Sequence, residues 1–193
     1  MSFTIRKSKG LADVAAFAQK ILDVPGGVNI KVAELGGAVV EAGTPIAKGS
    51  DNLYHVCKTA VVAANVAADA TTITVKKGHH FKVGDIVMAA ANSKAYAITA
   101  ISTNSGDSNL DDFTIGTAIG SMTAGDTLYQ GLSAVASTSK LKYTAEALVG
   151  EAHVVEANSN MFASAVLAGT VYGNRIPSLG SLHKEGLKGI FVV

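Results

Sequence analysis

A short phrase built around a Gly-Asp pair occurs twice in this chain, at residues 81–88 and again at 122–129. Each copy follows a β-type run, at 73–75 and at 113–115. Glycine adopts positive φ at no steric cost, and aspartate hydrogen-bonds its own nearby backbone, so the pair is typical of a turn between strands. The repeat predicts a mainly β fold, a small antiparallel β-barrel or sandwich, with four structural turn residues: Gly84, Asp85, Gly125 and Asp126.

Many of the apolar residues are small. Hydrophobic residues make up 48 % of the 193, but 31 of them are Ala, and the chain also holds 20 Gly and no Trp. A buried Leu or Phe stabilises a fold by roughly 1.5–3 kcal/mol, against about 0.8 kcal/mol for one methylene. The composition therefore favours added burial against other subunits, although a thin sandwich that is sufficient alone stays open.

The charge balance bears on the classes of partner. The net charge is +1, from 16 basic and 15 acidic residues, which lacks the basic excess that phosphate contacts require. No apolar run approaches the roughly 20 residues that span a bilayer, and residues 1–7 lack the apolar core of a signal peptide. Cys57 is the single cysteine, so no intrachain disulfide forms. We expect neither nucleic acid nor membrane as a partner.

The period of the apolar residues divides the chain into three parts. Residues 1–35 are predicted to form an N-terminal arm, in which apolar residues between 11 and 22 recur at helical spacing and Pro25 ends a short helix. Such a helix is marginal alone and needs a surface, either its own β-body or a partner. Residues 36–132 are predicted to form the β-body, and 133–193 a C-terminal β segment that completes the body or an oligomer interface.

Short apolar runs bounded by turn residues indicate the strands of the body. We expect one long strand over 53–62, whereas 144–149 reads either as strand or as a short helix. The chain ends in an apolar run, and such an end is usually tied into a sheet or an interface. The predicted interface residues are Ile190, Phe191, Val192 and Val193.

Candidate chemistry is sparse. His55 and Cys57 lie two apart on a predicted strand and share a face, as a nucleophile and base would, but nothing near them in sequence supplies an orienting carboxylate. The adjacent His79 and His80 point to opposite sides of an extended chain, and no spacing matches a zinc or calcium site. We therefore expect no enzyme, no metal and no cofactor.

Two phrases carry a resemblance to known proteins. Val-Val-Glu-Ala-Gly-Thr-Pro-Ile at 39–46, followed by 51–60, resembles phage capsid accessory proteins, in which such a corner precedes a short β-hairpin. Residues 76–85 resemble the head fibre proteins of phages that infect Bacteroides-type bacteria. The resemblance covers about 38–130 and implies a β-rich, often trimeric protein on the outer surface of the capsid, synthesised in the host cytoplasm and without enzymatic activity.

Three hypotheses follow. In the first, a homotrimeric capsid decoration or head fibre protein docks on the major capsid protein through its arm, by Arg6, Lys7, Lys9, Leu11, Val14, Ile21 and Leu22. In the second, a β-sandwich adhesin or carbohydrate-binding module contacts a host glycan through loop 103–109 and Asp111-Asp112. In the third, His55 and Cys57 form a hydrolase.

Overall fold

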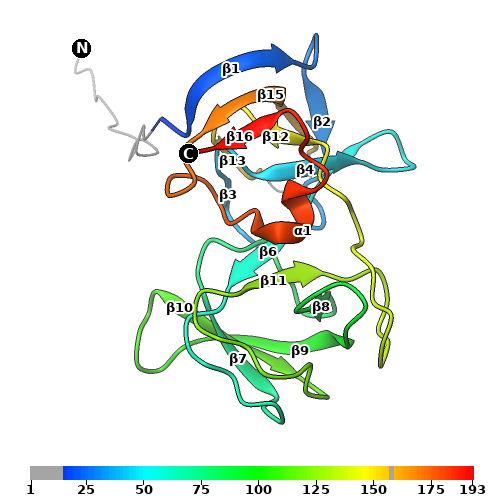
Figure 1. The fold of residues 1–193 in the computed structure, drawn as a ribbon, viewed down its shortest axis with the longest axis vertical. Helices are drawn as coiled ribbons and strands as arrows, with labels where there is room; N and C mark the ends of the chain where they lie inside the picture. The colour runs from blue at the N-terminus through cyan, green and yellow to red at the C-terminus, as the bar shows by residue number, and fades with distance from the viewer. Residues whose placement is uncertain (1–14, 157–158) are drawn as a thin grey trace, which may run out of the picture.

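The structure, a computed structural model, describes residues 15–156 and 159–193, and it is mainly β as the sequence predicts (Figure 1). The eight strands of the larger sheet come from both ends of the chain: β1 (Phe17–Asp23), β2 (Val28–Ile30), β4 (Pro45–Lys48), β5 (Tyr54–Val56), β12 (Ala147–Val149), β14 (Met161–Ala163), β15 (Ala165–Val171) and β16 (Ile190–Val192). The six strands of the second sheet are consecutive: β6 (Thr59–Val61), β7 (Thr72–Lys76), β8 (Ile86–Met88), β9 (Ala95–Thr103), β10 (Leu110–Ile115) and β11 (Thr127–Gln130). A small third sheet pairs β3 (Val39–Val40) with β13 (His153–Val154).

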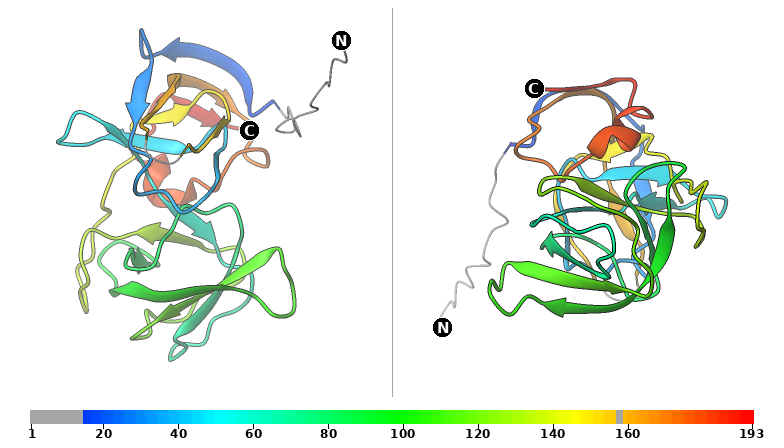
Figure 2. Two further views of the ribbon diagram at one scale, coloured as in Figure 1. Left: turned by 180° about the vertical axis from the view of Figure 1, so that it is seen from behind. Right: turned by 60° about the horizontal axis from the view of Figure 1, so that its bottom comes forward.

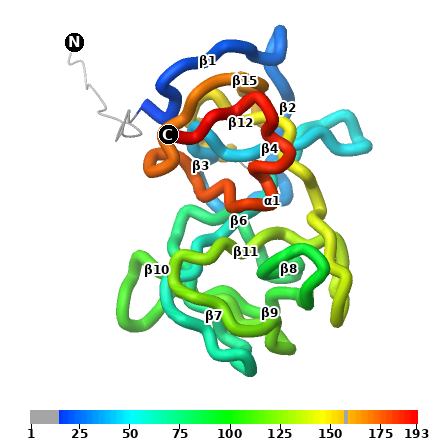
Figure 3. Tube along the Cα trace, in the orientation of Figure 1, coloured from blue at the N-terminus to red at the C-terminus, as the bar shows by residue number. Residues whose placement is uncertain are grey.

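The two larger sheets occupy opposite ends of the molecule, and the view from behind agrees (Figure 2). Each has its own apolar cluster: Ile73, Phe113 and Leu128 are fully buried in the six-stranded part, and Ile30 and Ile46 in the eight-stranded part. The tube in Figure 3 shows the chain leaving the upper sheet after β5, building the lower one, and returning after β11. The chain therefore crosses between two cores at residues 57–58 and again over 131–146.

The six-stranded sheet curls until its ends meet. Its strand order is β6-β11-β8-β9-β10-β7. A bridge between Val62 and Val75, with the Ala63 N–H donating to the Thr74 carbonyl at 2.8 Å, joins the chain just after β6 to β7. The result is a small barrel-like body.

This body has an internal two-fold relation that follows the sequence repeat. β7 and β10 are antiparallel with Ile73 opposite Phe113, and β8 and β11 are antiparallel with Met88 opposite Tyr129, so each strand of the repeat pairs with its own counterpart around these residues. The Gly84 N–H donates to the Ile98 carbonyl, and the Gly125 N–H to the Val62 carbonyl, both at 2.8 Å. The repeat divides this body into two units, β6 to β8 and β9 to β11. The Gly-Asp turn of the first unit packs against β9, and that of the second unit packs against Val62, directly after β6.

The predicted short helix of the arm is wrong where the structure describes it: residues 17–23 form β1, antiparallel to β15. Three turns of helix with a narrow apolar stripe are marginal, whereas a strand here gains backbone hydrogen bonds from an existing sheet. Residues 11–14 of that prediction lie outside the described residues.

Other element predictions also change. The expected long strand 53–62 is two strands, because the chain leaves one sheet at Cys57 and enters the other at Thr59. Residues 147–149 are strand, which removes the helical alternative there, and the short α1 (Gly180–Lys184) had no counterpart among the predictions. No helix among residues 15–156 and 159–193 is long and apolar enough to cross a membrane.

The sheets cross the predicted boundaries at 35/36 and 132/133. The larger sheet combines β1 and β2 with β4, β5 and the C-terminal strands, while β6 to β11 form the second sheet by themselves. The division of the chain into independent units remains a prediction.

Candidate functional site

The two Gly-Asp turns have the same backbone geometry. Gly84 and Gly125 have φ of +94° and +98°, values that favour glycine. In each turn the aspartate N–H donates to the carbonyl three residues earlier, at 3.1 Å. The carboxylate accepts the N–H of that same earlier residue: Lys82 N to Asp85 Oδ2 is 2.8 Å, and Thr123 N to Asp126 Oδ2 is 2.7 Å. The four residues thus close turns by local hydrogen bonds, which is the role their sequence predicts.

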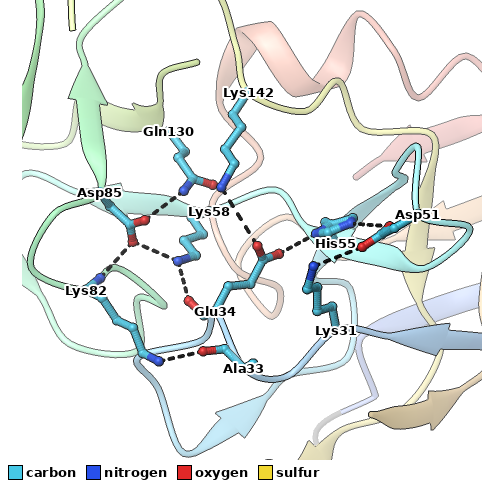
Figure 4. Close-up of polar contacts among 10 residues, drawn as sticks. All are labelled: Lys31, Ala33, Glu34, Asp51, His55, Lys58, Lys82, Asp85, Gln130 and Lys142. Atoms are coloured by element: carbon cyan, nitrogen blue, oxygen red, sulfur yellow. Dashed lines mark hydrogen bonds and ion pairs between the residues drawn. The ribbon is translucent and has the colours of Figure 1, made fainter. Parts of the chain in front are cut away.

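A buried polar cluster lies where the chain crosses between the sheets (Figure 4). At its centre is Lys58, between β5 and β6, whose side chain is 1 % exposed. Its ammonium donates to Asp85 Oδ2 at 2.7 Å and to the Glu34 carbonyl. Asp85 Oδ1 accepts from Gln130 Nε2 at 3.0 Å. The first Gly-Asp turn therefore also neutralises a buried charge.

Burial dominates the electrostatics of Lys58. It lowers the pKa of the ammonium, and the hydrogen bond and charge of Asp85 oppose that change. The attraction between two buried charges roughly offsets the cost of removing them from water, but one charge without its partner is strongly unfavourable. The Lys58–Asp85 pair therefore requires the two segments, 27 residues apart, to stay in contact.

His55 forms the second half of the cluster. Its ring nitrogens lie 2.7 Å from Glu34 Oε1 and 3.0 Å from Asp51 Oδ1, and its ring stacks on Tyr143 with centroids 4.4 Å apart. The hydrogen bond from His55, followed by that from Lys31, lowers the pKa of Asp51. Burial raises the pKa of Tyr143 to about 12, with smaller contributions from the two carboxylates.

This arrangement differs from that of a catalytic base. His55 is 3 % exposed, and both of its nitrogens already face carboxylates of the chain, so no ring nitrogen is left for a substrate. Cys57 lies instead in an apolar cluster with Leu148, Leu179 and Leu187, where burial raises the pKa of its thiol. A nucleophilic cysteine needs the opposite change. Within the described residues no hydrogen bond joins His55 to Cys57.

The adjacent histidines have separate environments. His79 accepts the Phe81 N–H at Nδ1 and lies 3.2 Å from Asp111 through Nε2, with its ring edge-on to Phe113. Burial lowers the pKa of His79, and it lowers that of His80 to about 4. No group of three His, Cys, Asp or Glu side chains in the described part of the chain is placed to hold a metal ion.

The carboxylates considered for glycan contact have internal partners. Asp111 faces His79, and Asp112 Oδ1 accepts from Thr74 Oγ1 at 2.7 Å and from Asn104 Nδ2 at 3.1 Å. The loop before β10 is held by its own bonds, since Asn104 Oδ1 accepts the N–H groups of residues 106 and 107. The side chains of Asp111, Asp112 and Asn104 therefore form hydrogen bonds within the fold.

The predicted docking and interface residues that the structure describes lie on β1, on β16 and at Val193, beside β15 of the larger sheet. β1 and β16 flank β15, and the side chains of Ile21, Leu22, Phe191 and Val193 are between 54 % and 67 % exposed, while Val192 is 39 % exposed. Ile190 is half-buried against the cluster that contains Cys57. The remaining predicted docking residues, Arg6, Lys7, Lys9, Leu11 and Val14, lie outside the described residues.

Sequence reasoning missed Lys58, Glu34 and Gln130. A signal for Lys58 was present: it is the one charged residue in the mostly apolar stretch from Val56 to Val62. A charged residue inside such a run either leaves the strand or finds a buried partner. Glu34 and Gln130 carry no comparable signal, because only the fold brings them beside His55 and Asp85.

Comparison of the chain with protein-family models, with curated proteins and with solved structures finds no match.

Proposed function

We propose that the protein is a structural component of a phage head, a capsid-bound decoration or head fibre protein that acts by self-association and by contact with the major capsid protein. The observation that carries the proposal is the exposed apolar side chains of β1 and β16, on either side of β15 (Figure 1). Exposed apolar patches mark contact surfaces in proteins that assemble.

The chemistry of the buried groups supports a structural role. The polar cluster uses its charges inside the fold, and the thiol of Cys57 is buried with a raised pKa. The phrases at 39–46 and 76–85 resemble capsid accessory and head fibre proteins, which are often trimeric. A homotrimer on the outer surface of the capsid is the assembly we propose.

The self-association is tested by mass photometry of the full chain. A species of three times the 19.6 kDa chain mass is expected, and Phe191→Asp with Val193→Asp should convert it to monomer, because two charges would be buried in the contact. Leu132→Asp is the matched control, since Leu132 is 60 % exposed outside this surface. A native chain that stays monomeric at micromolar concentration contradicts the trimer.

Capsid binding is tested by co-sedimentation with expanded phage heads that lack accessory proteins. Saturable retention of the native chain, reduced by Ile21→Asp with Leu22→Asp and unchanged by Leu132→Asp, supports the proposal. A glycan array run in parallel examines the adhesin alternative. Reproducible binding to a defined sugar, without retention on any head preparation, would refute the structural role.

A further inference from the structure

The internal repeat gives each Gly-Asp turn an equivalent, but the two aspartates have different surroundings. Asp85 binds the buried ammonium of Lys58, whereas Asp126 is exposed. Asp126 Oδ2 accepts from Thr123 N at 2.7 Å and from Thr123 Oγ1 at 3.0 Å. Across residues 15–156 and 159–193, Asp126 Oδ1 has no hydrogen-bond or ion-pair partner.

The hydrogen bonds between the units identify which residues correspond. The Val62 N–H donates to the Asp126 carbonyl and the Ile98 N–H to the Asp85 carbonyl, so Val62 and Ile98 are equivalent. Lys58 stands four residues before the first of these, and Lys94 stands four residues before the second. The chain therefore carries a lysine at both equivalent positions.

The same relation explains why a hollow is present at the second turn. Gln130, directly after Tyr129, donates to Asp85 and fills the space beside it. The equivalent residue, directly after Met88, is Ala89, which is too short to reach Asp126. A hollow of about 380 Å³ lies there, lined by Ala89, Asp126, Thr127, Tyr129 and Ser181.

The lining of this hollow is mainly polar and suits an ammonium group. Asp126 supplies a carboxylate, and Thr127, Tyr129 and Ser181 supply hydroxyl groups with lone pairs that can accept. The Thr127 hydroxyl lies 2.8 Å from Ser178 Oγ, and the Tyr129 hydroxyl lies 3.5 Å from Ser181 Oγ. Met122 and Ala89 supply the smaller, apolar part of the lining. Lys94 does not fill the hollow, because its side chain is exposed and is not part of the lining.

We propose that this hollow binds the primary alkylammonium group of a ligand outside the chain, held by Asp126 as Lys58 is held by Asp85. The internal equivalent shows that this turn accepts an ammonium on its carboxylate, at 2.7 Å between Nζ and Oδ2. A charge-assisted hydrogen bond of this kind is roughly twice as strong as a neutral one. The site is independent of the proposed capsid role.

The test is a titration of the full ¹⁵N-labelled chain with n-butylammonium chloride, followed by amide chemical shifts at constant ionic strength. Saturable shifts are expected at Gly125, Asp126 and Ser181, and n-butanol at equal concentration should produce none there. Asp126→Asn should weaken binding by about tenfold or more, because it removes the charge and keeps the oxygen that closes the turn. Asp69→Asn, on an exposed aspartate outside the hollow, should leave the titration unchanged.

Two further variants make the outcome decisive. Ala89→Gln should abolish binding by filling the hollow as Gln130 fills its equivalent, with the spectrum otherwise native. Lys94→Met should leave binding unchanged. Chemical shift changes that arise only in Lys94→Met would show that the ammonium of Lys94 binds Asp126 in the native chain. The absence of such changes in the native chain and in every variant would show that the hollow binds no ammonium. Either result overturns the proposal.

Two ligands distinguish a lysine of a partner protein from a free amine as the source of the ammonium. One is a short peptide with a single lysine and blocked ends, and the other is the diamine putrescine. Both carry the group that Asp126 recognises. Tighter binding of the peptide assigns the hollow to a lysine of a partner protein, and tighter binding of the diamine assigns it to a free amine.

Discussion

Removal of one charge from the Lys58–Asp85 pair should destabilise the fold far more than removal of both. Asp85→Asn keeps the shape of the side chain but leaves an ammonium that is 1 % exposed without its counter-charge. The amide can still be accommodated, since Gln130 Oε1 has no partner within the described residues and can accept from it after a flip. The cost is therefore that of an unpaired buried charge, about 3–5 kcal/mol at pH 7.

The reciprocal change should cost less. Lys58→Met leaves the Asp85 carboxylate, which is 16 % exposed and still accepts from Gln130 Nε2 and Lys82 N, so we expect about 3 kcal/mol. The double variant Lys58→Met with Asp85→Asn buries no charge. It should be more stable than the sum of the two single losses predicts, by about 2 kcal/mol or more.

The measurement is equilibrium unfolding in urea, followed by far-ultraviolet circular dichroism because the chain has no tryptophan. Asp126→Asn is the matched control from the other half of the repeat. It makes the same chemical change at an exposed carboxylate that has no cationic partner in the described part of the chain, and it should cost under about 1 kcal/mol.

The pH dependence of Asp85→Asn distinguishes a charge effect from a packing effect. Without Asp85 the pKa of buried Lys58 falls further below that of the unfolded chain, so the unfolded state binds more protons between the two values. Stability of this variant should then rise as pH increases from 7 toward 10. Losses that simply add in the double variant, with no rise at high pH, would refute the reasoning.

Two further predictions concern buried titratable groups. Burial lowers the pKa of His80 and of His183 to about 4, below the value near 6.5 in the unfolded chain. Protons therefore bind the unfolded state first, and the free energy of unfolding should fall by about 2 kcal/mol per histidine between pH 7 and pH 5. Urea unfolding at both pH values measures this loss, and His183→Gln should reduce the dependence of stability on pH. Cys57 is 2 % exposed with a raised pKa, so the native chain should resist a thiol reagent at pH 8 and react fully in urea; fast labelling of the folded chain would contradict this placement.

The β class of the fold was readable from local patterns. The alternation at 72–76 and the repeated Gly-Asp phrase depend on a few neighbouring residues, and both lie where the sequence predicts, as β7 and as two turns of positive φ. The conformation of residues 17–23 was not readable in this way. Their apolar spacing suits a helix, but pairing with β15, about 150 residues away, makes them a strand.

The candidate sites were less readable than the fold. The sequence drew attention to His55 and Cys57 as a pair, yet their partners come from separate parts of the chain and give them unrelated environments. Lys58, which follows Cys57 and precedes β6, is the centre of the buried polar cluster. Its position as the one charged residue between Val56 and Val62 was the only local indication of this role.

The sequence by itself determined where this chain turns and that it forms strands, because glycine at positive φ and aspartate bonded to its own backbone act over three or four residues. Only the tertiary structure decided that Asp85 neutralises a buried lysine while its repeat equivalent Asp126 faces an open hollow. That difference depends on residues 27 and 45 positions from Asp85, whose approach is set by the packing of the sheets and not by any local pattern.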